Sequence, residues 1–209
     1  MTVCCVLRSG GPTFGPRWVR AIYAAVREHA PGARFVCLTD VALPGIPHLP
    51  LVHDWPKWWA KVEMWRPGLF SGTVLYLDLD TLVMGDLSPF SAYGGRLAFL
   101  SDLYQPRKFI GSGVVLFDGS DPPDLYDRFR ADPAGIMAHH TVRSDYWYQS
   151  VAPTADRIQA LYPGMVCSYK ADARQGPPAG AALVCGHGEP RFSDPAAGWA
   201  HEHWKRLAA

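Results

Sequence analysis

Short apolar runs alternate with polar and glycine-rich stretches along the chain. Residues 2–7 (TVCCVL) and 73–78 (TVLYLD) are almost wholly apolar, which is typical of parallel strands covered on both faces. Similar runs predict further strands at residues 34–40, 97–102 and 112–118. We expect residues 73–78 to form a central strand.

Apolar residues at helical spacing follow the first strand. Pro16 suits a first helical turn, and apolar side chains then recur three to five residues apart: Trp18, Ile22, Tyr23 and Val26. This spacing predicts an amphipathic helix between the strands at residues 2–7 and 34–40.

Two shorter helices are predicted farther along the chain. One covers residues 58–65, with a shared apolar side formed by Trp58, Val62 and Trp65. The other covers residues 124–133 and is expected to end at Pro133. Residues 44–56 read as an irregular connection, and residues 173–182 as a long surface loop in a coil-rich C-terminal third.

The alternation of strands and helices predicts an α/β fold. We expect a mixed, mainly parallel central sheet flanked by helices. The sequence contains neither an internal repeat nor a linker, so residues 1–209 are interpreted as one domain.

Charge and hydropathy exclude several classes of partner. The 20 Lys and Arg residues nearly balance the 19 Asp and Glu residues, and a net charge of +1 gives no reason to expect nucleic-acid binding. The first residues lack a basic segment followed by an apolar one, and no apolar run approaches the roughly 20 residues of a membrane span. We therefore expect a cytoplasmic protein without a membrane span.

The cysteines point to the same compartment. They are odd in number and form no CxxC pair: Cys4, Cys5, Cys37, Cys167 and Cys185. We expect reduced, mostly buried thiols.

Candidate chemistry begins where the strand at residues 73–78 ends. Asp78 and Asp80 are one residue apart, and a backbone turn at Leu79 would let both carboxylates reach one hard cation. Ligands of open α/β sheets bind beyond the carboxyl ends of the strands, where this pair lies. The alternative is that the aspartates only stabilise a turn. Asp86 is interpreted as an ordinary turn residue.

The apolar run followed by Asp78 and Asp80 also resembles the DxDxT nucleophile motif of haloacid-dehalogenase-type phosphatases, although Thr81 here follows Asp80 directly. In that reading Asp78 would attack phosphorus and Asp80 would act as acid and base. That family usually carries the motif near its N-terminus, with a later acidic pair. Here a complete βαβ segment precedes the motif, and the later acidic pair is not evident.

Several motifs in order resemble family 8 of the glycosyltransferases, which have the nucleotide-sugar-binding GT-A fold and include glycogenin and bacterial galactosyltransferases. AKVEMW followed by VLYLDLDTLVMGDL is similar to the family's lysine-containing helix and metal-binding DxD strand. IGSGVVLFD resembles its Asn-Ser-Gly strand, SDYWYQ its Asp-Gln motif, and VCGHGEPRFSD its C-terminal His-Gly signature. The resemblance covers most of the chain.

The resemblance implies a metal-dependent transferase that uses a nucleotide sugar, a UDP-sugar, and an unidentified acceptor, with retention of anomeric configuration. It assigns Mn²⁺ or Mg²⁺ to Asp78, Asp80 and His187, a mixed oxygen and imidazole set that favours Mn²⁺. Asp145 would face the reacting sugar. The substrate-binding residues implied are Leu7, Ser9, Lys61, Leu79, Ser112, Gly188 and Arg191. Among these, Lys61 and Arg191 would contact the diphosphate.

Two positions depart from the family pattern. Gly111 stands where an asparagine is frequent, and Tyr146 where a glutamine is frequent. Both replaced side chains contact sugar in the family. A catalytically silent nucleotide-sugar-binding protein is therefore an alternative to an active transferase.

Overall fold

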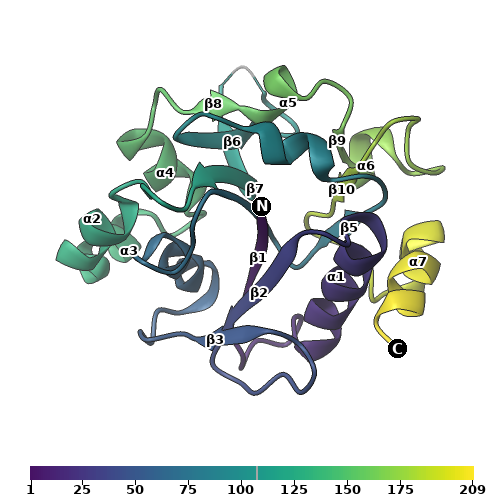
Figure 1. Ribbon diagram of the computed structural model, residues 1–209, viewed down its shortest axis with the longest axis horizontal. Coiled ribbons are helices and arrows are strands. Elements are labelled where there is room, and N and C mark those ends of the chain that lie inside the picture. Colours follow the sequence, from purple (N-terminus) through teal and green to yellow (C-terminus); the bar gives the residue numbers. More distant parts are fainter. Residues whose placement is uncertain (107) are drawn as a thin grey trace.

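Strands form two sheets in residues 1–106 and 108–209, the part of the chain that the computed structural model describes (Figure 1). From edge to edge, the large sheet contains β3 (His48–Pro50), β2 (Arg34–Thr39), β1 (Thr2–Leu7), β4 (Thr73–Leu77), β7 (Ile110–Asp118), β6 (Leu97–Ser101) and β8 (Asp156–Arg157). The small sheet contains β5 (Thr81–Val83), β10 (Leu183–Cys185) and β9 (Val166–Ser168).

The large sheet is mixed and mainly parallel. The pairs β1–β2, β1–β4, β2–β3 and β6–β8 are parallel, whereas β7 is antiparallel to both of its neighbours, β4 and β6. The predicted α/β class and the predicted central position of residues 73–78 are confirmed.

Helices connect the strands and cover both faces of the large sheet. The α-helices are α1 (Pro16–His29), α2 (Leu125–Ala131), α3 (Pro133–His139), α4 (Asp145–Val151), α5 (Ile158–Leu161), α6 (Tyr169–Asp172) and α7 (Trp199–Leu207). The 3₁₀ helices are η1 (Lys57–Trp65), η2 (Ser88–Ala92) and η3 (Pro195–Ala197).

Alternate residues of β1 enter two separate apolar cores. Val3, Cys5 and Leu7 belong to the cluster that includes α1, α7 and the small sheet. Cys4 and Val6 belong to the cluster on the other face, which includes η1, α2 and α4. A strand buried on both faces cannot show polar alternation, which explains its continuous apolar sequence.

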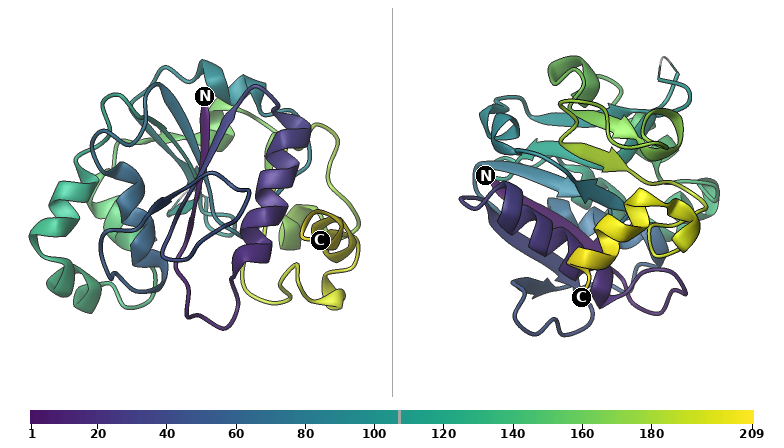
Figure 2. Two further views of the ribbon diagram at one scale, coloured as in Figure 1. Left: turned by 60° about the horizontal axis from the view of Figure 1, so that its bottom comes forward. Right: turned by 90° about the vertical axis from the view of Figure 1, so that its right-hand side faces the viewer.

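The amphipathic helix α1 forms as its sequence predicts. It begins at Pro16, and its buried residues include Trp18, Ile22 and Val26. α7 packs beside it, as the two views of Figure 2 show, with the Trp18 and Trp204 rings 5.0 Å apart. The carboxyl end of the chain therefore helps to cover the first helix.

The predicted helix at residues 58–65 is a 3₁₀ helix, η1, and this changes which side chains share a face. With three residues per turn, Trp59, Val62 and Trp65 lie along one buried side, and all are at most 4% exposed. The prediction that Trp58 would join Val62 and Trp65 is wrong. Trp58 is 38% exposed and faces a pocket.

The structure contains several elements that the sequence patterns did not indicate. β3 lies within the connection at residues 44–56, where it pairs with β2. Pro133 ends one helix and also begins α3, because proline suits a first helical turn. The C-terminal third, expected to be rich in coil, contains β9, β10 and α7, although residues 173–182 form the expected loop.

The five cysteines are free and buried, as expected. Burial raises the pKa of the Cys4 and Cys5 thiols well above the ordinary range, which disfavours the reactive thiolate. Among the described residues, no helix has both the length and the apolar character needed to cross a membrane.

Candidate active site

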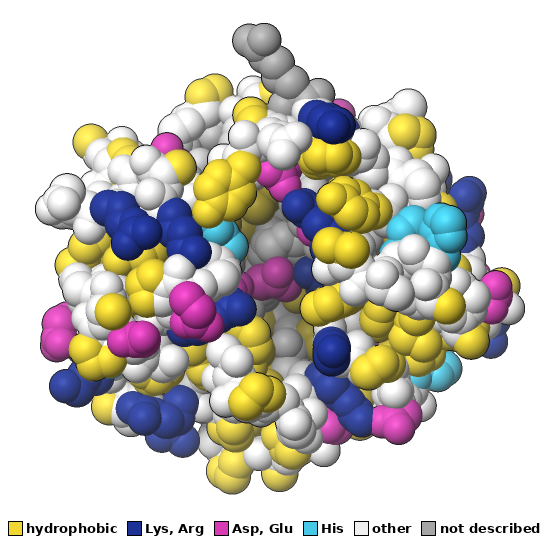
Figure 3. Space-filling model, turned by 180° about the vertical axis from the view of Figure 1, so that it is seen from behind, with side chains coloured by type: hydrophobic (Ala, Val, Ile, Leu, Met, Phe, Trp, Pro, Cys, Tyr) yellow, Lys and Arg dark blue, Asp and Glu magenta, His cyan; other side chains and the backbone are white. Residues whose placement is uncertain are grey.

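A pocket of about 340 Å³ opens where strand ends of both sheets meet. Asp78 follows β4, Asp102 follows β6, and Gly186 follows β10. The start of β7 reaches the same edge because that strand runs in the opposite direction. Seen from behind, the molecule has a hollow with charged side chains around it (Figure 3). Strand ends that converge in this way are the usual ligand site of open α/β sheets.

Asp78 is held at the floor of the pocket by a lysine and a tyrosine. Lys61 Nζ donates to both carboxylate oxygens at 3.1 and 3.2 Å, and Tyr76 donates its hydroxyl at 2.5 Å. Lys61 also donates to the Ser112 carbonyl at 3.3 Å. At 6% exposed, this lysine is a buried cation whose charge is balanced by Asp78.

Asp80 lies deeper and pairs with the C-terminal segment. Arg191 donates to the Asp80 carboxylate at 2.5 Å. The backbone carbonyl of Asp80 accepts a hydrogen bond from the Gly186 amide at 2.7 Å. Burial, followed by the negative charge of Asp78, raises the pKa of Asp80 to about 7. The backbone turns at Leu79, as predicted, with the Thr81 amide donating to the Asp78 carbonyl at 3.0 Å, and the Leu79 side chain packs in the core and does not line the pocket.

The small sheet brings the segment of Asp78 and Asp80 next to the C-terminal segment that contains His187. The residue after Asp80 begins β5, which pairs with β10 so that Thr81 lies opposite Cys185. Gly186 then follows directly. A Cβ at Gly186 would lie 2.9 Å from the Asp80 carbonyl and 2.8 Å from the Phe192 ring, so only glycine allows this close approach.

His187 lines the same pocket with both ring nitrogens next to hydroxyl groups. Nδ1 is 3.0 Å from the Tyr104 hydroxyl, and Nε2 is 2.8 Å from the Ser168 hydroxyl. Burial, followed by the positive charge of Lys170, lowers the pKa of His187, which favours the neutral ring. Gly188 has φ +62°, a conformation that glycine adopts readily.

The proposed metal ligands share one pocket, but they do not form a closed cage. Among residues 1–106 and 108–209, no group of three His, Cys, Asp or Glu side chains lies in positions that could hold a metal ion. The carboxylate pair of Asp78 and Asp80 nevertheless suits a hard divalent cation chemically, and such ions often take one or two carboxylates plus substrate phosphates. The carboxylates present therefore fit a cation that arrives with a diphosphate.

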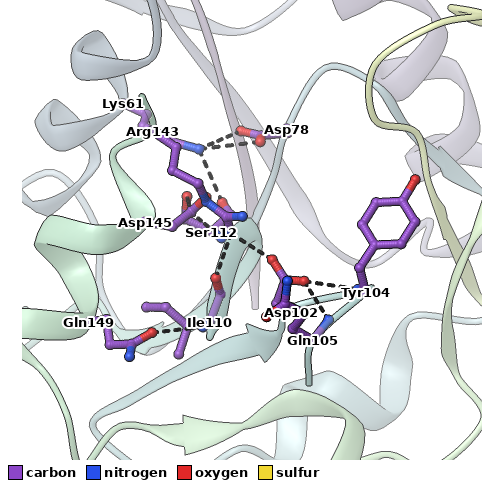
Figure 4. Close-up of polar contacts among 10 residues, drawn as sticks. All are labelled: Lys61, Asp78, Asp102, Tyr104, Gln105, Ile110, Ser112, Arg143, Asp145 and Gln149. Atoms are coloured by element: carbon purple, nitrogen blue, oxygen red, sulfur yellow. Dashed lines mark hydrogen bonds and ion pairs between the residues drawn. The ribbon is translucent and has the colours of Figure 1, made fainter. Parts of the chain in front are cut away.

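A second group of charged residues lines the pocket beside the Lys61–Asp78 pair, as drawn in Figure 4. Ser112 donates to Asp145 Oδ1 through its amide at 2.8 Å and its hydroxyl at 2.5 Å. Arg143 donates to Asp145 Oδ2 at 2.8 Å and to Asp102 Oδ2 at 2.8 Å. Asp145 is thus a fixed carboxylate at the start of α4 that lines the pocket.

Two predicted nucleotide-contacting residues lie at the end of β1, outside the described lining of the pocket. The Leu7 side chain is fully buried in the core. Ser9 donates to Asp40 through its amide at 2.8 Å and its hydroxyl at 2.7 Å. Their role toward a nucleotide base stays a prediction.

Among the pocket residues that sequence reasoning missed, three have polar side-chain contacts there: Asp102, Tyr104 and Arg143. Asp102 follows a predicted strand, which is the signal that identified Asp78, so it could have been found. Arg143 and Tyr104 lie in irregular segments, and their neighbours along the chain give no indication of their contacts.

No protein-family model and no curated protein matches the sequence, but solved glycosyltransferase structures match the fold. GlyE of Streptococcus pneumoniae TIGR4 has a TM-score of 0.71 at 11% identity and covers 99% of this chain, which spans only 62% of GlyE. The galactosyltransferase LgtC, solved with donor and acceptor sugar analogs, has a TM-score of 0.61 at 14% identity, covering 100% of this chain and 95% of LgtC.

The bifunctional glycosyltransferase WbbM is a third such structure, with a TM-score of 0.59 at 10% identity. It covers 100% of this chain, which spans 49% of WbbM. At these identities the likeness establishes a shared fold. The expected GT-A-type fold is therefore confirmed, and these neighbours give no support to the haloacid-dehalogenase alternative.

Proposed function

We propose that this protein is a glycosyltransferase that moves a sugar from a UDP-sugar to an acceptor, with Mn²⁺ or Mg²⁺ bound beside the donor diphosphate. One observation carries the proposal. In a fold shared with glycosyltransferases, Asp78 and Asp80 share a single pocket with the distant residue His187 at the carboxyl edge of the sheet, and Arg191 of the same C-terminal segment pairs with Asp80. That edge is where such sheets bind nucleotides.

Two basic residues paired with the pocket's aspartates fit a departing diphosphate. Breaking the anomeric bond leaves negative charge on phosphate oxygens, and preorganised positive groups lower the barrier to that step. Lys61 is fixed by Asp78, and Arg191 by Asp80, so neither must reorganise during the reaction. A divalent ion held by Asp78 and Asp80 would supply further positive charge at the same oxygens.

The neighbouring group around Asp145 fits the sugar. As the anomeric centre gains positive charge, a fixed carboxylate nearby stabilises it, and Asp145 is anchored by Ser112 and Arg143 for that role. The proposed outcome is retention of anomeric configuration, with Asp145 on the face of the reacting sugar.

A thermal-shift experiment tests the proposal directly. UDP with Mn²⁺ should raise the Tm well beyond the effect of either alone, because the ion and the diphosphate bind as one unit. At ligand concentrations of about 100 Kd the stabilisation is about 2.7 kcal/mol, or roughly 5–10 °C for a chain of this size. Equal shifts with and without Mn²⁺ would contradict metal dependence. Release of UDP from UDP-sugars would separate an active enzyme from a silent binding protein.

His187→Ala should weaken the coupling between Mn²⁺ and UDP while the protein stays folded. Loss of a ligand or of its hydrogen-bonded support costs about 10–100-fold in metal affinity. The measurement is the Mn²⁺ dependence of the UDP-induced Tm shift. Asp86→Ala is the control, because Asp86 is exposed and accepts hydrogen bonds only from Ser88 in the described structure. If His187→Ala lowers only the unliganded Tm, the histidine is structural and the three-ligand prediction is wrong.

A further inference from the structure

Arg143 joins two carboxylates that lie on different elements of the pocket wall. Its Nε donates to Asp145 Oδ2 at 2.8 Å, and one terminal nitrogen donates to Asp102 Oδ2 at 2.8 Å and to the Ile110 carbonyl at 2.9 Å (Figure 4). Asp145 begins α4, and Asp102 follows β6. The guanidinium therefore links a helix to two strands of the large sheet.

The other contacts of these carboxylates come from neutral donors. Asp102 Oδ1 accepts from the amides of Tyr104 and Gln105, and Asp145 Oδ1 accepts from Ser112. Among the described residues, Arg143 is the only cation that forms an ion pair with either carboxylate. Although burial raises the pKa of Asp102, the Gln105 amide and the Arg143 guanidinium lower it overall. Both carboxylates thus depend on one side chain for charge balance.

The position of Arg143 is itself restricted. Its side chain is 31% exposed, and its guanidinium lies 5.3 Å from the centre of the Tyr146 ring. The planar guanidinium group has several N–H donors and can donate to two carboxylates and a carbonyl at the same time. The single ammonium group of lysine cannot reproduce that geometry. Tyr146, which departs from the family's usual glutamine, thus packs against this guanidinium group.

Each bridged carboxylate lines the pocket and keeps unused hydrogen-bonding capacity. A carboxylate oxygen can accept two hydrogen bonds, and Oδ2 of Asp102 and of Asp145 each accepts one from Arg143 in the described structure. Sugar hydroxyl groups are donors that suit these positions. The basic residues that face a diphosphate, Lys61 and Arg191, instead pair with Asp78 and Asp80.

We propose that Arg143 is a positioning residue that holds Asp102 and Asp145 at a fixed separation, so that together they bind the hydroxyl groups of an uncharged donor sugar. The inference rests on the proposed function and adds that different residues recognise the two parts of the donor. Arg143, through Asp102 and Asp145, governs recognition of the sugar, whereas Lys61 and Arg191 govern recognition of the diphosphate. Removing Arg143 should therefore affect a UDP-sugar far more than UDP.

Calorimetric titrations in the presence of Mn²⁺ test this division with UDP, UDP-glucose and UDP-galactose. In Arg143→Met, the Kd of UDP should stay within about 3-fold of the wild-type value, while the better-bound UDP-sugar should lose at least about 10-fold. Arg143→Lys keeps the charge and should lose sugar affinity nearly as strongly. The matched control is Arg130→Met, which removes an exposed arginine paired with Asp127 on α2 and should change neither Kd.

Chemical rescue of turnover provides a second measurement, which should show no effect if Arg143 has only a structural role. In Arg143→Ala, millimolar guanidinium should restore part of the UDP-sugar turnover, whereas an equal concentration of ammonium should not. Equal losses for UDP and UDP-sugars, or wild-type sugar affinity in both Arg143→Met and Arg143→Lys, would overturn the inference. If Arg143→Met does not fold, the sugar affinity of Arg143→Lys and the guanidinium rescue of Arg143→Ala test the inference instead. If the wild-type protein binds none of the three compounds, the proposed function itself fails.

Discussion

Asp78→Asn is expected to lower UDP-sugar turnover by at least about 10³-fold without unfolding the protein. The asparagine side chain has nearly the same shape, but its neutral amide can neither balance the Lys61 charge nor hold a divalent cation. Loss of charge stabilisation at a departing diphosphate is expected to raise the barrier by about 4 kcal/mol, which corresponds to this factor. The measurement is UDP release from UDP-glucose or UDP-galactose with Mn²⁺ present.

The control for this experiment is Asp86→Asn, which removes a carboxylate that forms only a local turn with Ser88 in the described structure. Turnover within about 10-fold of wild type in Asp78→Asn would contradict the proposed role of the carboxylate. An aryl phosphate provides a second check. Its hydrolysis by the wild-type protein and not by Asp78→Asn would instead favour a nucleophilic phosphatase.

The centre of the fold was predictable because its strands are buried on both faces. β1 and β4 consist of consecutive apolar residues, and that pattern places them in the middle of a parallel sheet. α1 was predictable because its apolar residues repeat at helical spacing and Pro16 begins it. In these segments, local pattern and tertiary burial agree.

Other elements depend on contacts that their own sequence does not encode. β3 is three residues long and exposed, so it lacks an apolar pattern and forms by pairing with β2. η1 has the residues of an amphipathic helix, but its 3₁₀ geometry exchanges Trp58 for Trp59 on the buried side. α7 was not anticipated in a segment that reads as coil. It packs on α1 through aromatic contacts with Trp18.

The candidate site was predictable only in part, for a similar reason. The resemblance placed Asp78, Asp80 and His187 together, and the structure brings them to one pocket through the pairing of β5 with β10. It did not indicate that Arg191 would pair with Asp80. Nor did it indicate Arg143, since a side chain that bridges a helix and a strand end is identified only after the fold places both.

Lys61→Met is expected to lower turnover strongly and stability only slightly. The variant therefore separates the role of the buried lysine in catalysis from its contribution to stability. Met has nearly the length of lysine and fills the same apolar space in η1, so the core contacts of Trp59 and Trp65 should persist. Asp78 would lose its ion pair, but it keeps the Tyr76 hydroxyl and is 33% exposed, so water can solvate it. We therefore expect a stability loss of only about 1–2 kcal/mol.

Turnover should fall much further than stability, by about 10²–10³-fold, because Lys61 supplies preorganised positive charge beside the departing diphosphate. Turnover is measured as UDP release, and stability as the free energy of unfolding in urea, both on the same preparation. Lys57→Met is the matched control, since Lys57 is an exposed lysine of the same helix and its loss should change neither quantity. A Lys61→Met protein that is strongly destabilised but turns over UDP-sugars normally at low temperature would show that this lysine serves only to neutralise Asp78. In that case the diphosphate would have to rely on Arg191 and the bound cation, and Arg191→Met should then cause the loss that Lys61→Met does not.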